Sequence, residues 1–146
     1  MAKNSNGLVL KGELHEYAQV LRMLGDDRCE AMCIDGAKRI CYMHGNDNLH
    51  VAANDIILVG LRYIYPCSRA LQKVSESCRK TMLIDGRMYL FYYSGNMERK
   101  KELKRDYKAD VIHKYTPGDV VELIAYGELP ENINKLNEGD SASLCN

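Results

Sequence analysis

The sequence predicts a mainly β protein, with a small antiparallel sheet, a helix near the C-terminal end and a middle segment that contains its own hairpin. Three observations support this. Short segments rich in β-branched residues alternate with turn-forming residues. Two Asp-Gly pairs lie between apolar segments. A Thr-Pro-Gly-Asp pattern precedes an amphipathic segment. At 146 residues, the chain is long enough for one packed domain.

Four strands are expected in the first half of the chain. The first alternates two sets of mostly apolar side chains and ends at the turn Gly25-Asp26-Asp27. The second and third flank Asp35-Gly36, a hairpin signal because both residues tolerate positive φ. The fourth follows a polar loop and is rich in Ile, Leu and Val. These strands cover residues 16–24, 28–34, 37–43 and 55–62.

A last strand and a helix are expected after residue 106. Residues 107–115 have strand character, and the helix is predicted over residues 117–126. Thr116 is the expected N-cap, Pro117 occupies the first helical position, and Asp119 completes a capping box. Gly127 and Pro130 provide a stop. The expected apolar face of the helix consists of Val120, Val121, Leu123 and Ile124.

The middle segment, residues 63–105, has secondary-structure signals of its own. Ser68 is a candidate cap for a short helix with Leu71, Val74 and Cys78 on one stripe. Residues 81–84 and 87–93 then flank Asp85-Gly86 as a second hairpin. Residues 30–46 and 80–96 share seven identities at an offset of 50 without a gap. A partial duplication and convergence on a common Asp-Gly hairpin both explain this similarity.

The net charge of zero hides a segregation of charge along the chain. Residues 1–62 hold 7 basic and 8 acidic side chains, residues 63–105 hold 10 and 4, and residues 106–146 hold 3 and 8. The middle segment is therefore a candidate surface for a polyanion. Its densest cluster is equally compatible with a solvated helix face, because interspersed glutamates can form i,i+4 pairs. The cluster comprises Arg99, Lys100, Lys101, Lys104 and Arg105.

Composition excludes several other classes of protein. An apolar fraction of 46% with 27% charged residues excludes a wholly disordered chain. The longest apolar runs, such as residues 56–59, are far shorter than the about 18 residues of a membrane-spanning helix, and no secretory signal is present. We therefore expect a cytoplasmic monomer without a cofactor. The six cysteines lack zinc-site spacing, so we expect reduced core residues and no metal.

Five stretches together carry a family resemblance. In order, they are EYAQVLRMLG at residues 16–25, EAMCIDGAKRIC at 30–41, DIILVGLR at 55–62, DYKADVIHKY at 106–115 and AYGELP at 125–130. In sequence and order they resemble translation initiation factor 1A of eukaryotes and archaea. The resemblance implies an OB-fold, a closed five-stranded antiparallel barrel with a helix after the last strand. The corresponding domain covers residues 13–130, interrupted by an insertion at 63–105 between the fourth and fifth strands, with tails at 1–12 and 131–146.

The resemblance also implies a function. Such a factor is not an enzyme; it binds the decoding region of the small ribosomal subunit at the aminoacyl-tRNA site. There it promotes initiator tRNA recruitment and start-codon selection. Its partners are the ribosomal RNA and proteins of the small subunit, the other initiation factors and the initiator tRNA complex. Small OB barrels in general bind irregular or single-stranded nucleic acid through a cationic face with stacking side chains.

Basic residues at matching positions are the candidate RNA contacts. Each cation neutralises a phosphate and releases condensed counterion, so affinity falls with salt. On the barrel, the resemblance assigns this role to Lys38, Arg39, Arg62, Lys108 and Lys114. On the insertion, whose charge is +6, the candidates are Arg79, Lys80, Arg87 and the Arg99–Arg105 cluster. Tyr89, Tyr92 and Tyr93 either stack on bases or pack back onto the barrel.

The sequence departs from the family at several positions. His44 replaces an arginine, and His50 falls at a tryptophan position, where its imidazole can stack on a base but offers less area. The basic N-terminal arm is reduced to Lys3, and the acidic tail that meets factor 5B has no counterpart, so contact with that partner is not expected. Two rivals remain: an enzyme, for which no catalytic motif is present, and a divergent paralogue acting as a general RNA-binding protein or RNA chaperone.

Overall fold

A computed structural model describes residues 2–3, 7–44, 49–65, 72 and 74–133 of the chain. The chain divides into two compact units, which are described separately. The barrel unit consists of Met1–Leu61 and Tyr107–Asn146, and the insertion unit consists of Arg62–Asp106. The chain leaves the barrel unit along strand β6 (Ile56–Ile64) and returns along strand β10 (Lys104–Lys114). The insertion unit is therefore formed by one continuous segment.

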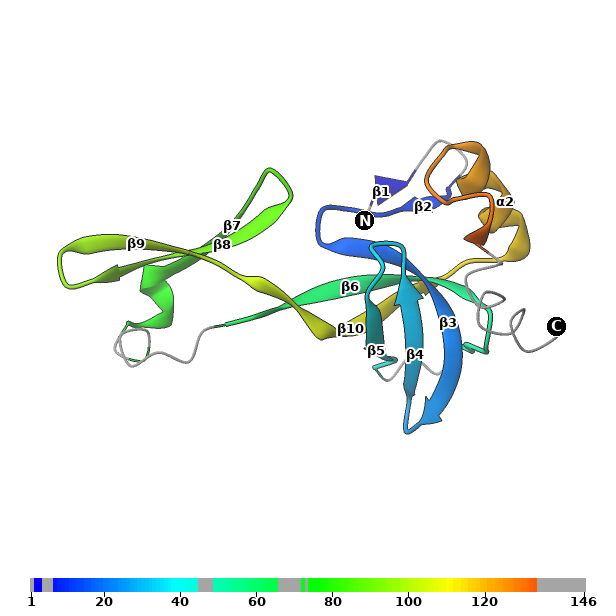
Figure 1. The fold of residues 1–146 in the computed structure, drawn as a ribbon, viewed down its shortest axis with the longest axis horizontal. Coiled ribbons are helices and arrows are strands. Elements are labelled where there is room, and N and C mark those ends of the chain that lie inside the picture. The colour runs from blue at the N-terminus through cyan, green and yellow to red at the C-terminus, as the bar shows by residue number, and fades with distance from the viewer. Residues whose placement is uncertain (1, 4–6, 45–48, 66–71, 73, 134–146) are drawn as a thin grey trace, which may run out of the picture. The chain divides into compact units, whose positions relative to one another are not determined.

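Five strands form a closed barrel in the order β10-β5-β4-β3-β6 (Figure 1). The pairs β3/β4, β4/β5 and β3/β6 are antiparallel, and β5/β10 is parallel. The predicted mainly β OB-fold barrel of five strands is therefore confirmed. The expected fully antiparallel pairing is wrong at β5/β10, because a closed barrel with an odd number of strands cannot alternate strand direction at every pair. The strands span His15–Gly25 (β3), Arg28–Cys33 (β4), Lys38–Tyr42 (β5), Ile56–Ile64 (β6) and Lys104–Lys114 (β10).

Small and β-branched side chains and thiols fill the inside of the barrel. Near the middle of the strands, alternate residues point inward and are buried, as in Ala18, Ala31 and Ala109. Three cysteines share this interior, so the prediction of reduced core cysteines is confirmed for Cys29, Cys33 and Cys41. Burial raises the pKa of the Cys33 thiol. The prediction is wrong for Cys78, which is exposed, and Cys67 and Cys145 lie outside the described residues.

Helix α2 (Pro117–Ala125) covers part of the outer surface of the barrel. The predicted capping box is confirmed, since the Asp119 amide donates to Thr116 Oγ1 at 3.2 Å and the Thr116 amide donates to Asp119 Oδ2 at 3.1 Å. Leu123 is buried in a cluster with Tyr17, Leu58 and Tyr115. Val121 was expected on the same apolar face but is exposed, because it points away from the stripe formed by positions 120, 123 and 124.

Both predicted tails contain buried residues. Two short strands, β1 (Ala2–Lys3) and β2 (Val9–Leu10), pair with each other. Leu8 and Val9 belong to the cluster under α2, and the Tyr115 hydroxyl donates to the Val9 carbonyl at 2.6 Å. Ile133 is buried in the same cluster. Residues 134–146, expected to be flexible, lie outside the described residues.

Tyr17 links the first barrel strand to the segment after α2. Its hydroxyl donates to Glu128 Oε2 at 3.0 Å and accepts from the Lys11 amide at 3.0 Å. Burial, reinforced by the Glu128 and Glu16 carboxylates, raises the pKa of Tyr17 to about 12. The neutral phenol is therefore the form that the folded state favours.

A pH dependence of stability follows from this shift. The unfolded pKa of a tyrosine is about 10, so the contribution of Tyr17 is fully present below pH 10 and is lost as pH rises through about 12. Tyr17→Phe is expected to reduce the free energy of unfolding by about 1 kcal/mol at pH 8 and to flatten its decline between pH 10 and 12. Urea unfolding at a series of pH values measures both effects. An equally steep decline in the variant would contradict the assignment.

The insertion unit contains a three-stranded antiparallel sheet, β7-β8-β9 (Figure 1). The strands span Arg79–Ile84 (β7), Arg87–Ser94 (β8) and Met97–Glu102 (β9), and a 3-10 turn, η1, spans Glu76–Cys78. The second predicted hairpin is confirmed by β7 and β8. The predicted helical stripe is wrong at Val74 and Cys78, which lie outside any α-helix, and Ser68 and Leu71 lie outside the described residues. The considered helix face at 99–105 is also wrong, since these residues are mostly in strands.

The two similar hairpins differ in their turns. In the first, the Gly36 amide donates to the Cys33 carbonyl at 2.9 Å and only Gly36 has a positive φ, of 90°, so the loop has three residues. In the second, Asp85 and Gly86 have φ values of 50° and 77°, so the loop has two residues. Strand pairing consequently differs by one residue between the copies. The two hairpins are therefore not structurally identical.

Candidate nucleic-acid interface

One outer face of the barrel gathers cationic and aromatic side chains from β5 and β10. In the parallel pair, Lys108 lies opposite Ile40 and Asp110 opposite Tyr42, while the intervening Ala109 is buried inside the barrel. Neighbouring residues of paired strands point to the same side of a sheet. We call this surface the β5–β10 face, and it consists of Lys38, Ile40, Tyr42, His44, Lys108 and Asp110.

His44 is held at the end of this face by two contacts. Its imidazole stacks on Tyr42 with ring centroids 6.0 Å apart and planes inclined by 14°. Its Nε2 also forms a hydrogen bond with Asp110 Oδ1. Stacked rings beside cations are typical of surfaces that bind unpaired bases. The sequence identified Lys38, His44 and Lys108 but missed Tyr42, although its position at i+4 from Lys38 in a strand places it on the same face.

Lys38 and Lys108 are the barrel cations best placed for phosphates. Lys38 is exposed, and no ion pair or hydrogen bond of its side chain occurs within the described residues. The ammonium of Lys108 lies 5.5 Å from the centroid of the Tyr107 ring. Neither side chain forms an ion pair with a carboxylate within the described residues, although Asp110 lies on the same face.

Arg39 has a different role from the one predicted. Its side chain is only 3% exposed and donates to Asp35 through two bonds, Nη1–Oδ1 at 3.0 Å and Nη2–Oδ2 at 2.8 Å. Burial alone would lower the pKa of Arg39, but hydrogen bonds to Asp35 and Cys33 raise it overall. The guanidinium thus fixes the β4–β5 loop from inside the barrel and leaves no surface for a phosphate. We therefore exclude Arg39 from the proposed interface.

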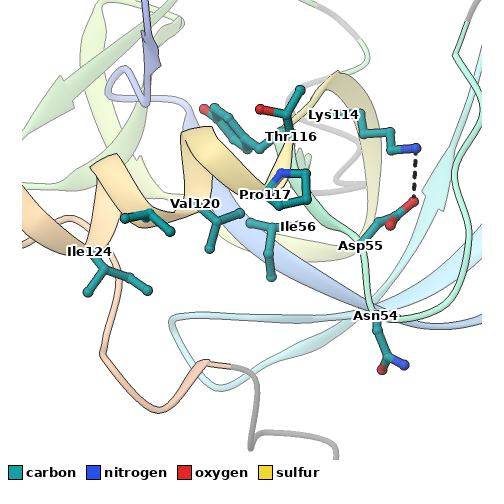
Figure 2. Close-up of a pocket in the computed structure, with 10 residues that line it drawn as sticks. Asn54, Asp55, Ile56, Lys114, Thr116, Pro117, Val120 and Ile124 are labelled. Atoms are coloured by element: carbon teal, nitrogen blue, oxygen red, sulfur yellow. Dashed lines mark ion pairs between the residues drawn. The ribbon is translucent and has the colours of Figure 1, made fainter.

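Lys114 lines a separate pocket beside α2 (Figure 2), whereas the side chain of His50 is exposed outside that lining. Lys114 Nζ forms an ion pair with Asp55 Oδ2 at 3.3 Å and donates to the His50 carbonyl at 2.7 Å. The pocket has a volume of about 590 Å³, and its apolar wall includes Ile56, Val120 and Ile124. Asp55 offsets the charge of Lys114, so this lysine is a weaker phosphate candidate than Lys38.

The predicted cations of the insertion unit lie on β6, β7, β8, β9 and the start of β10. Arg79 Nη2 donates to the Val74 carbonyl at 2.8 Å, and Arg87 Nε lies 3.8 Å from Glu102 Oε1. Lys100 lies over the ring of Tyr89. Arg62, at the start of the unit, is half-buried. The remaining predicted cations are exposed, namely Lys80, Arg99, Lys101, Lys104 and Arg105.

Within the part of the chain that the structure describes, no group of three or more His, Cys, Asp or Glu side chains could hold a metal ion. No described helix is both long enough and apolar enough to span a membrane.

The closed barrel and its β5–β10 face define an OB-fold protein with a surface suited to nucleic acid. A family model described as translation initiation factor 1A / IF-1 matches residues 5–70. Proteins named eukaryotic translation initiation factor 1A are 42% identical over 137 residues in Onobrychis viciifolia, 38% over 134 in Triticum aestivum and 35% over 136 in Dictyostelium discoideum. The chain belongs to the translation initiation factor 1A family.

These relatives are longer than the region that the chain matches. The alignments cover 92%, 90% and 92% of this chain and 66%, 65% and 67% of the three relatives. The chain therefore spans about two thirds of their length. The family match by residues 5–70 includes β3 to β6 of the barrel and ends within the insertion unit.

Proposed function

We propose that this protein acts in translation initiation by binding RNA of the small ribosomal subunit through the β5–β10 face. Its site is the decoding region where aminoacyl-tRNA binds, and its effect is to promote initiator tRNA recruitment and start-codon selection alongside the other initiation factors. This role is non-enzymatic and cytoplasmic. Family membership supports it.

The observation that carries the proposal is the juxtaposition of Lys38, Lys108 and the Tyr42–His44 stack on one side of the barrel. In OB-folds, the second and third strands form the surface that usually meets oligonucleotides. Here those strands are β4 and β5, so the β5–β10 face shares one strand, β5, with the surface that the architecture favours for nucleic acid. Lysines contact phosphates, while the stacked rings offer a surface to an unpaired base.

Co-sedimentation with purified small subunits across a salt series tests the proposal. Lys38→Gln and Lys108→Gln, singly and together, are expected to weaken binding. The log–log slope against salt is expected to fall by about 0.7 for each lost contact with unpaired RNA. Val121→Glu is the matched control, because it makes the same change in net charge as either single variant at an exposed position of α2.

The outcomes separate the candidate functions. Unchanged binding in the double variant would reject the β5–β10 face. A second candidate, a general RNA-binding protein or RNA chaperone, is favoured by the +6 charge of residues 63–105. It predicts that unrelated single-stranded RNA competes with small subunits at comparable concentrations. If only subunit RNA competes, the initiation role is supported.

A further inference from the structure

The sheet of the insertion unit has two chemically different faces. Met88 and Leu90 of β8 are buried in a small core with Leu103, and Tyr63 and Tyr92 pack against it. Side chains alternate along a strand, so the intervening residues of β8 point to the other face. That opposite face carries three aromatic residues at every second position, Tyr89, Phe91 and Tyr93. None of the three belongs to the core cluster.

Lysines from both edge strands flank this row of rings. Phe91 lies opposite Lys80 of β7 and Lys100 of β9. The Lys100 ammonium lies 4.2 Å from the centroid of the Tyr89 ring and 5.9 Å from that of Phe91. We call this surface the aromatic face, and it consists of Lys80, Tyr89, Phe91, Tyr93 and Lys100.

Two carboxylates share this side of the sheet. Glu98 lies opposite Tyr93, and Glu102 lies opposite Tyr89. Arg87 Nε approaches Glu102 Oε1 at 3.8 Å, which partly offsets that charge. Because residues 63–105 carry a net charge of +6, the unit as a whole still attracts a polyanion.

The spacing of the rings suits an extended nucleic-acid strand. Residues two apart on a strand are separated by about 6.5 Å, a distance over which successive bases of an extended single strand can be spread. Base stacking on aromatic side chains is tolerant of sequence, since every base has a π-face, and nearby lysines can contact the phosphates. Duplex RNA does not offer its base faces, so an unpaired strand is the matching ligand.

We propose that the aromatic face binds single-stranded RNA, with bases stacked on Tyr93 and its neighbours and phosphates near Lys80 and Lys100. It is a second RNA surface, separate from the β5–β10 face. The assignment resolves the tyrosines that the sequence left undecided: Tyr92 packs into the core of the insertion unit, whereas Tyr89 and Tyr93 lie on the opposite face. Phe91, between them, had not been singled out from the sequence.

Fluorescence anisotropy with a labelled oligouridine of about 12 nucleotides tests this surface in the full chain. Tyr93→Ala is expected to weaken binding by about 5- to 140-fold, the range for loss of one stacked base. Tyr93→Phe retains the ring and is expected to bind within about twofold of the unmodified protein. Tyr126→Ala is the matched control, since Tyr126 is 56% exposed and Tyr93 is 57% exposed. Because Tyr93 is so exposed, its replacement leaves the core of the sheet intact.

Each outcome of this experiment either supports or overturns RNA binding by the aromatic face. Equal binding by Tyr93→Ala and Tyr126→Ala would overturn the proposal, as would Tyr93→Phe binding as weakly as Tyr93→Ala. Loss of oligouridine binding in Tyr93→Ala alone supports it. The Lys38 and Lys108 variants, read by subunit co-sedimentation, report on the barrel separately. If they lose subunit binding while Tyr93→Ala still binds oligouridine normally, this inference fails and the proposed function stands.

Discussion

Asp35→Asn is expected to lower the free energy of unfolding of the barrel by about 3 kcal/mol, because it removes the carboxylate that accepts two hydrogen bonds from the buried Arg39 guanidinium. Asparagine keeps one acceptor oxygen, so the loss falls at the lower end of the range for breaking a buried ion pair. The guanidinium cannot escape by losing its proton, since arginine stays charged in proteins. Urea denaturation followed by far-UV circular dichroism measures the change.

Two further variants test whether the loss of stability comes from the Asp35–Arg39 ion pair. Asp85→Asn is the matched control, because Asp85 occupies the corresponding position in the second hairpin, where Tyr89 stands in place of the buried arginine, and lies in the two-residue turn. Its effect is expected to stay within about 0.5 kcal/mol. Adding Arg39→Met to Asp35→Asn is expected to regain most of the lost stability, since the buried guanidinium that lost its carboxylate is then removed as well. A stable Asp35→Asn variant would show that the pair is not needed.

Leu90→Ala is expected to unfold the insertion unit while the barrel remains folded. Leu90 is completely buried, and the core around it contains only two other buried residues, Met88 and Leu103, among those described. Truncating such a leucine costs about 2 to 5 kcal/mol, and a unit of this size has little stability in reserve. The barrel has a separate interior and is expected to keep its stability.

Native-state hydrogen exchange measures this effect strand by strand. Amides of β7, β8 and β9 are expected to lose protection in Leu90→Ala, while those of β3, β4 and β5 keep it. Met97→Ala is the control within the same unit, because Met97 is a large but exposed side chain at the start of β9. Loss of protection in both units at once would show that they fold as one cooperative structure.

Local patterns in the sequence were sufficient to predict most of the fold. Asp-Gly pairs indicated both hairpins, and Thr116 with Asp119 marked the start of α2. The local patterns gave wrong predictions where contacts with neighbouring elements determine secondary structure or burial. The charged segment 97–102 has helical i,i+4 pairing potential, yet it forms β9 because pairing with β8 completes the sheet. Val121 is apolar but exposed, because α2 buries only a narrow stripe.

The candidate site was harder to predict, for a physical reason. Residue type and family position do not say whether a cation points into or out of a closed barrel. Lys38 and Arg39 are adjacent, so alternation along β5 directs one outward and the other inward. Lys114 forms an ion pair with Asp55, which is distant in sequence and could not be assigned as its partner from local patterns. Conversely, the alternation of Tyr89, Phe91 and Tyr93 was visible in the sequence, but its meaning depends on which face the core covers.

The adjacency of β6 and β10 in the closed barrel bears on how this protein arose. The insertion follows β6 and precedes β10, which are neighbouring strands of the barrel. The distance between the two ends of the insertion is therefore fixed by the barrel, whatever the length of the insertion. A short loop and a whole folded unit can both connect β6 to β10, because the entropic cost of closing a loop rises only slowly with its length. A folded unit can therefore be inserted or deleted between β6 and β10 in a single evolutionary event, without any change in the strands of the barrel.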